Sequence, residues 1–312
     1  MTKTLILVHG RGFKPPRAAL EALWYAALRA GLARDAAAAI PAFEQCRHEF
    51  VYFGDETREM LTAAGRRHDA ALDLADLQNT LTELSALPRS KDFRRERYER
   101  LPGKTPIKEF LADIGAPALA ALHLEDRAIG RLLPELLDYW RGAASPMRRV
   151  DARLRQAVSA ALTRGDDVAI VAHCIGGVFA YNALWALSND AAASTDGKVA
   201  LWLTLGAPLG DEGVKRHLDD AGAERAGRYP SNVVAWINVA AEDDYVCHDD
   251  RVADDYRDML ERRLISRIDD VRIYNLAVRY GRSNPHNALG YLIHPRVSRA
   301  IATWLGVPPI AV

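Results

Sequence analysis

The sequence lacks long hydrophobic runs and has no excess of charge of one sign. No apolar stretch approaches the roughly 20 residues that a membrane-spanning helix needs. The 312 residues include 41 basic and 41 acidic side chains, which cancel. Because a neutral chain exerts no global attraction on nucleic acid or on an anionic membrane, we expect no nucleic-acid partner and no stable membrane insertion.

Cysteine is scarce as well. The three cysteines, Cys46, Cys174 and Cys247, are odd in number and widely spaced, which argues against a disulfide framework and against a paired zinc-binding motif. The first strand-like run already begins at Thr4, where a secretory leader would need a charged region followed by a separate apolar segment. We therefore expect reduced thiols, no cofactor, no metal and a cytoplasmic location.

Short apolar runs that alternate with helical patterns are the main signal in the chain. Six runs predict strands, over residues 4–9, 48–53, 168–171, 198–205, 232–239 and 271–276. Strands that alternate with helices, such as the helix expected over residues 212–220 between the fourth and fifth runs, predict a parallel sheet. We expect an α/β fold with a mostly parallel central sheet of about six strands, flanked by helices, in a single domain over residues 1–312.

Residues 56–150 interrupt this alternation. The stretch carries helical patterns, the first of which predicts a helix near residues 56–87, but no convincing strand, and it is longer than a crossover between two strands requires. Its basic run over residues 89–100 also contains Asp92, Glu96 and Glu99, so a solvated helix face is the better interpretation than an anion-binding patch. We predict a helical insertion over residues 56–150 and regard it as a candidate lid.

The stretch VAIVAHCIGG, residues 168–177, joins a buried strand to a turn with small residues around a central cysteine. It resembles the nucleophile elbow of the α/β-hydrolase superfamily, in which small residues two before and two after the nucleophile let the backbones pass. Ala172 and Gly176 occupy those positions, and Gly177 follows. Cys174 stands where the superfamily usually has serine. A cysteine in this position resembles the elbow of dienelactone hydrolases and polyhydroxyalkanoate synthases, members of the superfamily with a thiol nucleophile.

The run over residues 4–9 leads directly into Gly10, Arg11 and Gly12. A strand followed by HGxG resembles the loop that supplies one backbone N–H of the oxyanion hole in the same superfamily. The resemblance implies that the donors are the N–H groups of Arg11 and Ile175. Glycine on either side of a donor leaves the approach to it free of a Cβ.

The acid and the histidine of a triad follow later strands in the superfamily, and the chain has two candidates for each. Asp244 lies in a D-x-V context after the run over residues 232–239, and the adjacent Asp243 is the alternative. His286 and His294 both lie after the last predicted strand, and His286 is preferred because it lies in a loop soon after that strand, whereas Pro295 restrains His294. The resemblance favours Asp244 and His286.

The implied chemistry is acyl transfer on a small-molecule ester, lactone or thioester. Cys174 would attack the carbonyl, His286 would take the thiol proton and Asp244 would orient the imidazole. Two other interpretations stay open: a catalytically degenerate scaffold that acts as a binding protein, and a serine hydrolase that carries a Ser-to-Cys change. The residue pattern specifies neither the acyl chain nor the oligomeric state.

Overall fold

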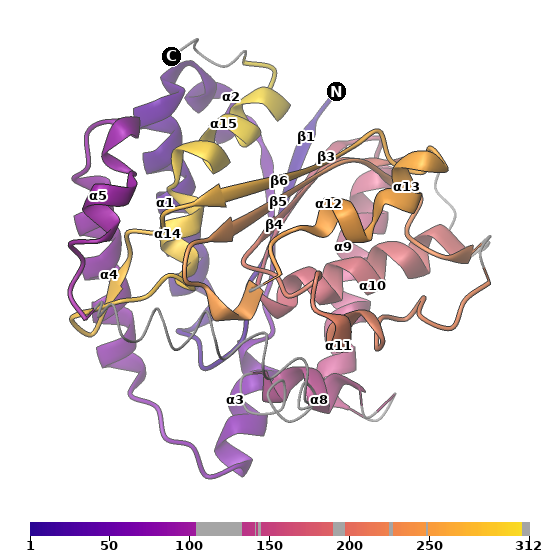
Figure 1. Ribbon diagram of the computed structural model, residues 1–312, viewed down its shortest axis with the longest axis horizontal. Helices are drawn as coiled ribbons and strands as arrows, with labels where there is room; N and C mark the ends of the chain where they lie inside the picture. Colours follow the sequence, from indigo (N-terminus) through magenta and orange to yellow (C-terminus); the bar gives the residue numbers. More distant parts are fainter. Residues whose placement is uncertain are drawn as a thin grey trace.

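A six-stranded sheet runs through the centre of the molecule (Figure 1). The computed structural model describes residues 1–103, 133–140, 142, 145–189, 197–224, 227–247 and 249–307. The strands are β1 (Lys3–Val8), β2 (Arg47–Val51), β3 (Asp167–His173), β4 (Val199–Leu205), β5 (Val233–Ala241) and β6 (Arg267–Ile273). Their order is β2-β1-β3-β4-β5-β6, and every neighbouring pair is parallel. The α/β fold expected from the sequence is confirmed.

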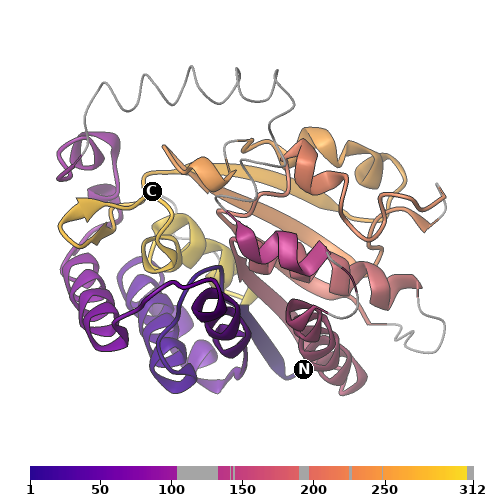
Figure 2. The same ribbon diagram turned by 90° about the horizontal axis from the view of Figure 1, so that it is seen from below.

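Helices cover both faces of the sheet (Figure 2). One layer contains α1 (Arg17–Asp35), α2 (Ile40–Gln45), α4 (Ala70–Ser85), α14 (Ala288–Leu292) and α15 (Pro295–Trp304). The other contains α8 (Pro134–Trp140), α9 (Arg149–Thr163), α10 (Ile175–Asn189), α11 (Glu212–Lys215), α12 (Val252–Asp255) and α13 (Arg257–Glu261). Leu5 and Leu7 of β1 pack into the first layer, and Ile6 and Val8 pack into the second. Burial on both faces explains why the central strands read as continuous apolar runs.

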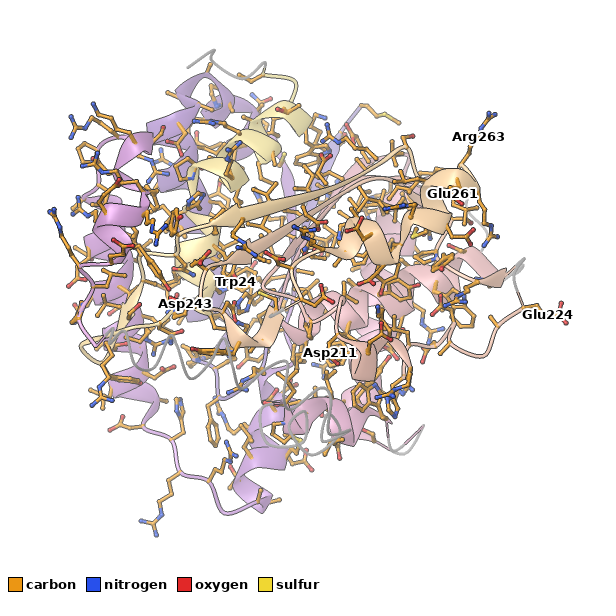
Figure 3. The ribbon with its side chains drawn as sticks, viewed as in Figure 1. Trp24, Asp211, Glu224, Asp243, Glu261 and Arg263 are labelled. Atoms are coloured by element: carbon orange, nitrogen blue, oxygen red, sulfur yellow. The ribbon has the colours of Figure 1, made fainter. Side chains whose placement is uncertain are left out.

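The buried and exposed side chains follow this layering (Figure 3). Trp24 of α1 is 2 % exposed and packs in the core between the first helical layer and the sheet. Glu224, Glu261 and Arg263 are exposed at the outer edge of the molecule. These charged side chains therefore lie at the periphery, as expected for groups that remain solvated.

Three predicted elements differ from the observed ones. The helix expected from residue 56 to 87 is broken into α3 (Gly54–Ala63) and α4, because Gly65 adopts a positive φ of 74° and Asp69 caps the start of α4. The helix expected over residues 212–220 is only the short α11. The last strand begins at Arg267 rather than at residue 271, since this edge strand exposes charged side chains and carries few apolar residues.

The predicted insertion over residues 56–150 is described in part. Its helix α4 packs against α1 and α14, and Leu77 and Leu84 join the core of the first layer. In its basic run, α5 (Arg95–Tyr98) pairs the charges of Arg95 and Glu99, as a solvated face does. Residues 104–132 lie outside the described residues, so the lid stays a prediction.

The strand order reverses direction between β1 and β3. The chain moves from β1 outward to β2, and then returns to the other side of β1 for β3, β4, β5 and β6. In open parallel sheets a crevice forms at such a switch point, beyond the carboxyl ends of the strands, and ligands bind there. The loop after β1 and the turn after β3 meet at this point, which is where the sequence predicts the oxyanion loop and the nucleophile.

Candidate active site

Cys174 occupies a strained turn between β3 and α10. Its φ is +57°, in the left-handed region that residues with a Cβ rarely adopt. The turn is held by the backbone N–H of Cys174, which donates to the carbonyl of Leu205 at 2.9 Å. Cys174 is fully buried. Strain of this kind at a thiol is typical of a nucleophile that the backbone presents at the tip of a turn.

Glycines let two neighbouring segments approach the turn. A Cβ on Gly10 would lie 2.6 Å from the Cβ of Cys174, and one on Gly176 would lie 2.5 Å from the carbonyl oxygen of His9. On the other side, a Cβ on Gly177 would lie 2.6 Å from that of Ala207. The turn is therefore enclosed by the loop after β1 and the loop after β4, and no larger residue fits at these three positions without movement.

His286 and Asp244 form the other half of the site. Nδ1 of His286 lies 2.9 Å from both carboxylate oxygens of Asp244, so this nitrogen carries a proton and donates it. The carboxylate also accepts from the hydroxyl of Tyr291 at 2.6 Å and from the backbone N–H of Val246 at 3.1 Å. These donors and the His286 charge outweigh burial and hold the pKa of Asp244 below its ordinary value.

The two alternative residues take other roles. Asp243 has a positive φ of 59° and accepts a hydrogen bond from the hydroxyl of Tyr98 at 2.7 Å. His294 caps α15, where its Nδ1 accepts from the backbone N–H of Arg296 at 3.2 Å. Burial lowers the pKa of His294 to about 3. The structure therefore brings Asp244 and His286 together, and it places Asp243 and His294 in contacts of their own.

The thiol and the imidazole act on each other electrostatically. Burial raises the pKa of Cys174. The charge of His286 and the backbone N–H of Arg11 lower it by more than burial raises it, so the net shift is downward. Burial lowers the pKa of His286, but Asp244 and Cys174 raise it to about 10. Nε2 of His286 is buried and makes no hydrogen bond of ordinary geometry within the described residues. The arrangement favours a thiolate beside an imidazolium.

The two expected oxyanion donors belong to the loop after β1 and to the start of α10, which adjoin the Cys174 turn. The backbone N–H of Arg11 interacts with the Cys174 sulfur. Ile175 is the first residue of α10, where a backbone N–H has no partner within its own helix. The Lys14 ammonium donates to the carbonyl of Arg11, and burial lowers its pKa to about 8, with the nearby Cys174 opposing that shift. Positive groups thus surround the sulfur.

Sequence reasoning missed two residues that hold the site together. Nε2 of His173 donates to the backbone carbonyl of His286 at 3.0 Å, and burial holds the pKa of His173 well below its ordinary value. The Tyr291 hydroxyl accepts from the backbone N–H of Ala241 at 2.9 Å while it donates to Asp244. His173 was visible beside the nucleophile, but nothing in the spacing of Tyr291 pointed to the acid.

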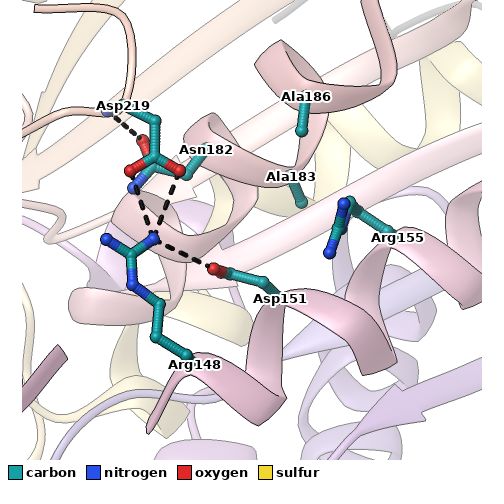
Figure 4. A pocket seen from close by; sticks show the side chains of 7 residues that line it. All are labelled: Arg148, Asp151, Arg155, Asn182, Ala183, Ala186 and Asp219. Atoms are coloured by element: carbon teal, nitrogen blue, oxygen red, sulfur yellow. Dashed lines mark hydrogen bonds and ion pairs between the residues drawn. The ribbon is translucent and has the colours of Figure 1, made fainter. Parts of the chain in front are cut away.

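A second polar region lies between α9 and α10 (Figure 4). The Arg148 guanidinium binds the carboxylates of Asp151 and Asp219, and the backbone N–H of Asp219 donates to the side chain of Asn182. A cavity of about 430 Å³ is lined by Arg148, Asp151, Arg155, Asn182, Ala183, Ala186 and Asp219. None of the predicted site residues lines it.

The described residues contain no group of three histidine, cysteine or acidic side chains arranged to hold a metal ion. Among the same residues, no helix has both the length and the apolar character needed to cross a membrane. Comparison with known proteins finds no match: no family model, no curated protein and no solved structure is similar to the chain.

Proposed function

We propose that this chain is a cysteine-dependent hydrolase of the α/β-hydrolase type, which cleaves a carboxylic ester, lactone or thioester. One observation carries the proposal: a thiol on a strained turn is electrostatically coupled to an imidazole whose other nitrogen donates to a buried carboxylate. Nucleophile, base and orienting acid in this relation are the minimum apparatus of nucleophilic acyl transfer.

The proposed reaction begins with the Cys174 thiolate attacking the substrate carbonyl. The negative charge that develops on the carbonyl oxygen is stabilised by the N–H groups of Arg11 and Ile175. The His286 imidazolium then gives its Nε2 proton to the departing alkoxide or thiolate, which leaves a thioester on Cys174. The neutral His286 takes a proton from water as the water attacks that thioester; the C–S bond then breaks, the carboxylic acid leaves and the thiolate–imidazolium pair is restored.

The other cysteines show what a structural thiol looks like in this fold. Burial raises the pKa of Cys46 to about 11, and burial with the Asp244 charge raises that of Cys247 well above the ordinary value. Only for Cys174 among the three do the surroundings lower the pKa. A cysteine that serves only as a small buried apolar side chain does not require a charged imidazole next to its sulfur.

The test compares four proteins on aryl esters and aryl thioesters of graded chain length. The proposal expects turnover by the wild type and by Cys46→Ala, a fall of at least about 1,000-fold in Cys174→Ala, and loss of turnover after treatment with iodoacetamide. Turnover that survives both Cys174→Ala and alkylation would overturn the proposal.

The fourth protein, Cys174→Ser, separates the remaining interpretations. A natural cysteine enzyme is expected to lose activity on this change, because the positive charge of His286 stabilises a thiolate, whereas a serine hydroxyl stays protonated. Much faster turnover by Cys174→Ser would identify a serine hydrolase that carries a replaced nucleophile. No turnover by any of the four, with Cys174 still alkylated, would identify a binding protein on a degenerate scaffold.

A further inference from the structure

Glu135, on α8 of the predicted insertion, lies against the oxyanion loop. It is 1 % exposed, and its Oε1 accepts from the backbone N–H of Gly12 at 2.7 Å. Gly12 follows Arg11, whose N–H interacts with the Cys174 sulfur. A carboxylate from a distant part of the chain is therefore held within one residue of a proposed oxyanion donor.

The second carboxylate oxygen of Glu135 is buried and has no hydrogen-bond partner within the described residues. A buried carboxylate oxygen without a donor is unfavourable, and proteins rarely keep one that serves no function. Nε2 of His286 is another buried polar atom without a hydrogen bond of ordinary geometry within the described residues, and the proposed reaction uses it. The proposed reaction makes no use of Glu135 Oε2.

The surrounding charges restrict the kind of donor that suits Glu135. The Lys14 ammonium experiences the charges of both Cys174 and Glu135, so the three groups share one electrostatic environment. The Arg11 charge acts on Lys14 as well. A substrate ammonium would add to the positive charges of Lys14, Arg11 and His286, whereas a neutral hydroxyl supplies the missing donor without that repulsion.

From these contacts we infer that Glu135 is a specificity-determining residue, and that Oε2 accepts a hydrogen bond from a hydroxyl on the acyl group of the substrate. The inference rests on the proposed function, because it concerns which acyl groups the Cys174 site prefers. Oε1 anchors the oxyanion loop, and Oε2 selects the substrate.

The first measurement uses the wild type alone, with pairs of aryl esters that differ only in a hydroxyl or a methoxy group on the acyl chain. A hydrogen bond to a charged acceptor is expected to favour the hydroxylated ester by about 10- to 100-fold in kcat/KM. The corresponding amino ester is expected to be poorer than the hydroxylated one. Equal rates for the hydroxyl and methoxy members, or preference for the amino ester, would overturn the inference.

The second measurement uses Glu135→Gln. Glutamine keeps an oxygen that accepts from Gly12 and replaces Oε2 with an N–H donor. The preference for hydroxyl over methoxy is expected to disappear or to invert. Asp138→Asn is the matched control on the same helix, since Asp138 bonds to Ser145, and it is expected to keep the wild-type preference.

Both readouts are ratios within one protein, so a general loss of activity leaves them interpretable. An unchanged ratio in Glu135→Gln, with turnover intact, would overturn the role of Glu135 and leave the proposed function standing. A wild type that turns over neither member of the pair would instead overturn the proposed function.

Discussion

Two buried polar regions of the molecule use the same kinds of side chain in different ways. At the Cys174 site, Oε2 of Glu135 has no hydrogen-bond partner within the described residues, His286 interacts with the thiol through charge, and Cys174 has a positive φ. Between α9 and α10, the Tyr139 hydroxyl donates to Asp151 and accepts from Asn182 at 2.9 Å. There the buried polar groups are bonded to one another.

The difference distinguishes polar groups that are available to react with a substrate from polar groups that hold helices in place. Polar groups that are fully bonded to each other fix the positions of the helices that carry them, and have little capacity left for a ligand. Groups left without a partner next to a strained thiol gain their partner only when a substrate binds. This comparison supports the proposal that Cys174 is the reactive site, whereas the cluster around Arg148 and Asp151 joins α8, α9 and α10.

The largest effect is expected from His286→Ala. Loss of the imidazole removes the general base and the charge that lowers the pKa of Cys174, so ester turnover should fall by about 100- to 10,000-fold. Alkylation of Cys174 by iodoacetamide at pH 7 should slow in the same variant. His294→Ala serves as the control for turnover, and an equal fall there would contradict the assignment of His286.

Gly10→Ala tests whether the loop after β1 must lie against the nucleophile turn. The added Cβ would approach the Cβ of Cys174 to 2.6 Å, and overpacking of this kind destabilises a protein by about 1–3 kcal/mol. Urea unfolding should report that loss, and ester turnover should fall because the oxyanion loop is displaced. Gly165→Ala, where no atom lies within 4 Å of the added Cβ, should spare turnover.

His9 should make the protein less stable in acid. Its Nε2 accepts from the backbone N–H of Phe53 at 2.9 Å, and burial lowers its pKa to about 3, below the unfolded value of 6.5. The neutral form is thus favoured in the folded state, and its stabilisation is complete above pH 6.5 and lost as the pH falls toward 3. Between pH 6.5 and 5 the loss is about 1.5 kcal/mol.

The check is His9→Gln, which keeps an acceptor for Phe53 and does not titrate. Its free energy of unfolding, measured in urea at both pH values, should fall by about 1.5 kcal/mol less than that of the wild type. Parallel changes in the two proteins would show that His9 is protonated in the folded state.

Asp151 should have the opposite and smaller effect over the same pH range. Burial raises its pKa from 3.8 to about 6, so the folded state prefers the protonated form and gains stability as the pH falls through 6. Between pH 6.5 and 5 that gain is about 1 kcal/mol. Asp151→Asn should lose it while ester turnover stays near that of the wild type. A large loss of turnover would instead connect this cluster to the Cys174 site.

The sequence alone determined the fold class and the local features of the site. Continuous apolar runs such as residues 168–171 are readable because both faces of the strand are buried. The small residues around Cys174 are readable because the close approach of neighbouring backbones leaves room for nothing larger. The pattern failed at the edge strand β6, where one-sided burial weakens the apolar signal.

The tertiary structure decided what depends on contacts between distant residues. The D-x-V context favoured Asp244 over the adjacent Asp243, but only the folding of the loops placed His286 on Asp244 and Tyr98 on Asp243. The contact of Glu135 with Gly12 joins positions 123 residues apart. Local sequence determines backbone shape through steric demands, whereas hydrogen-bond partners and pKa shifts are set by what the whole fold brings within a few ångströms.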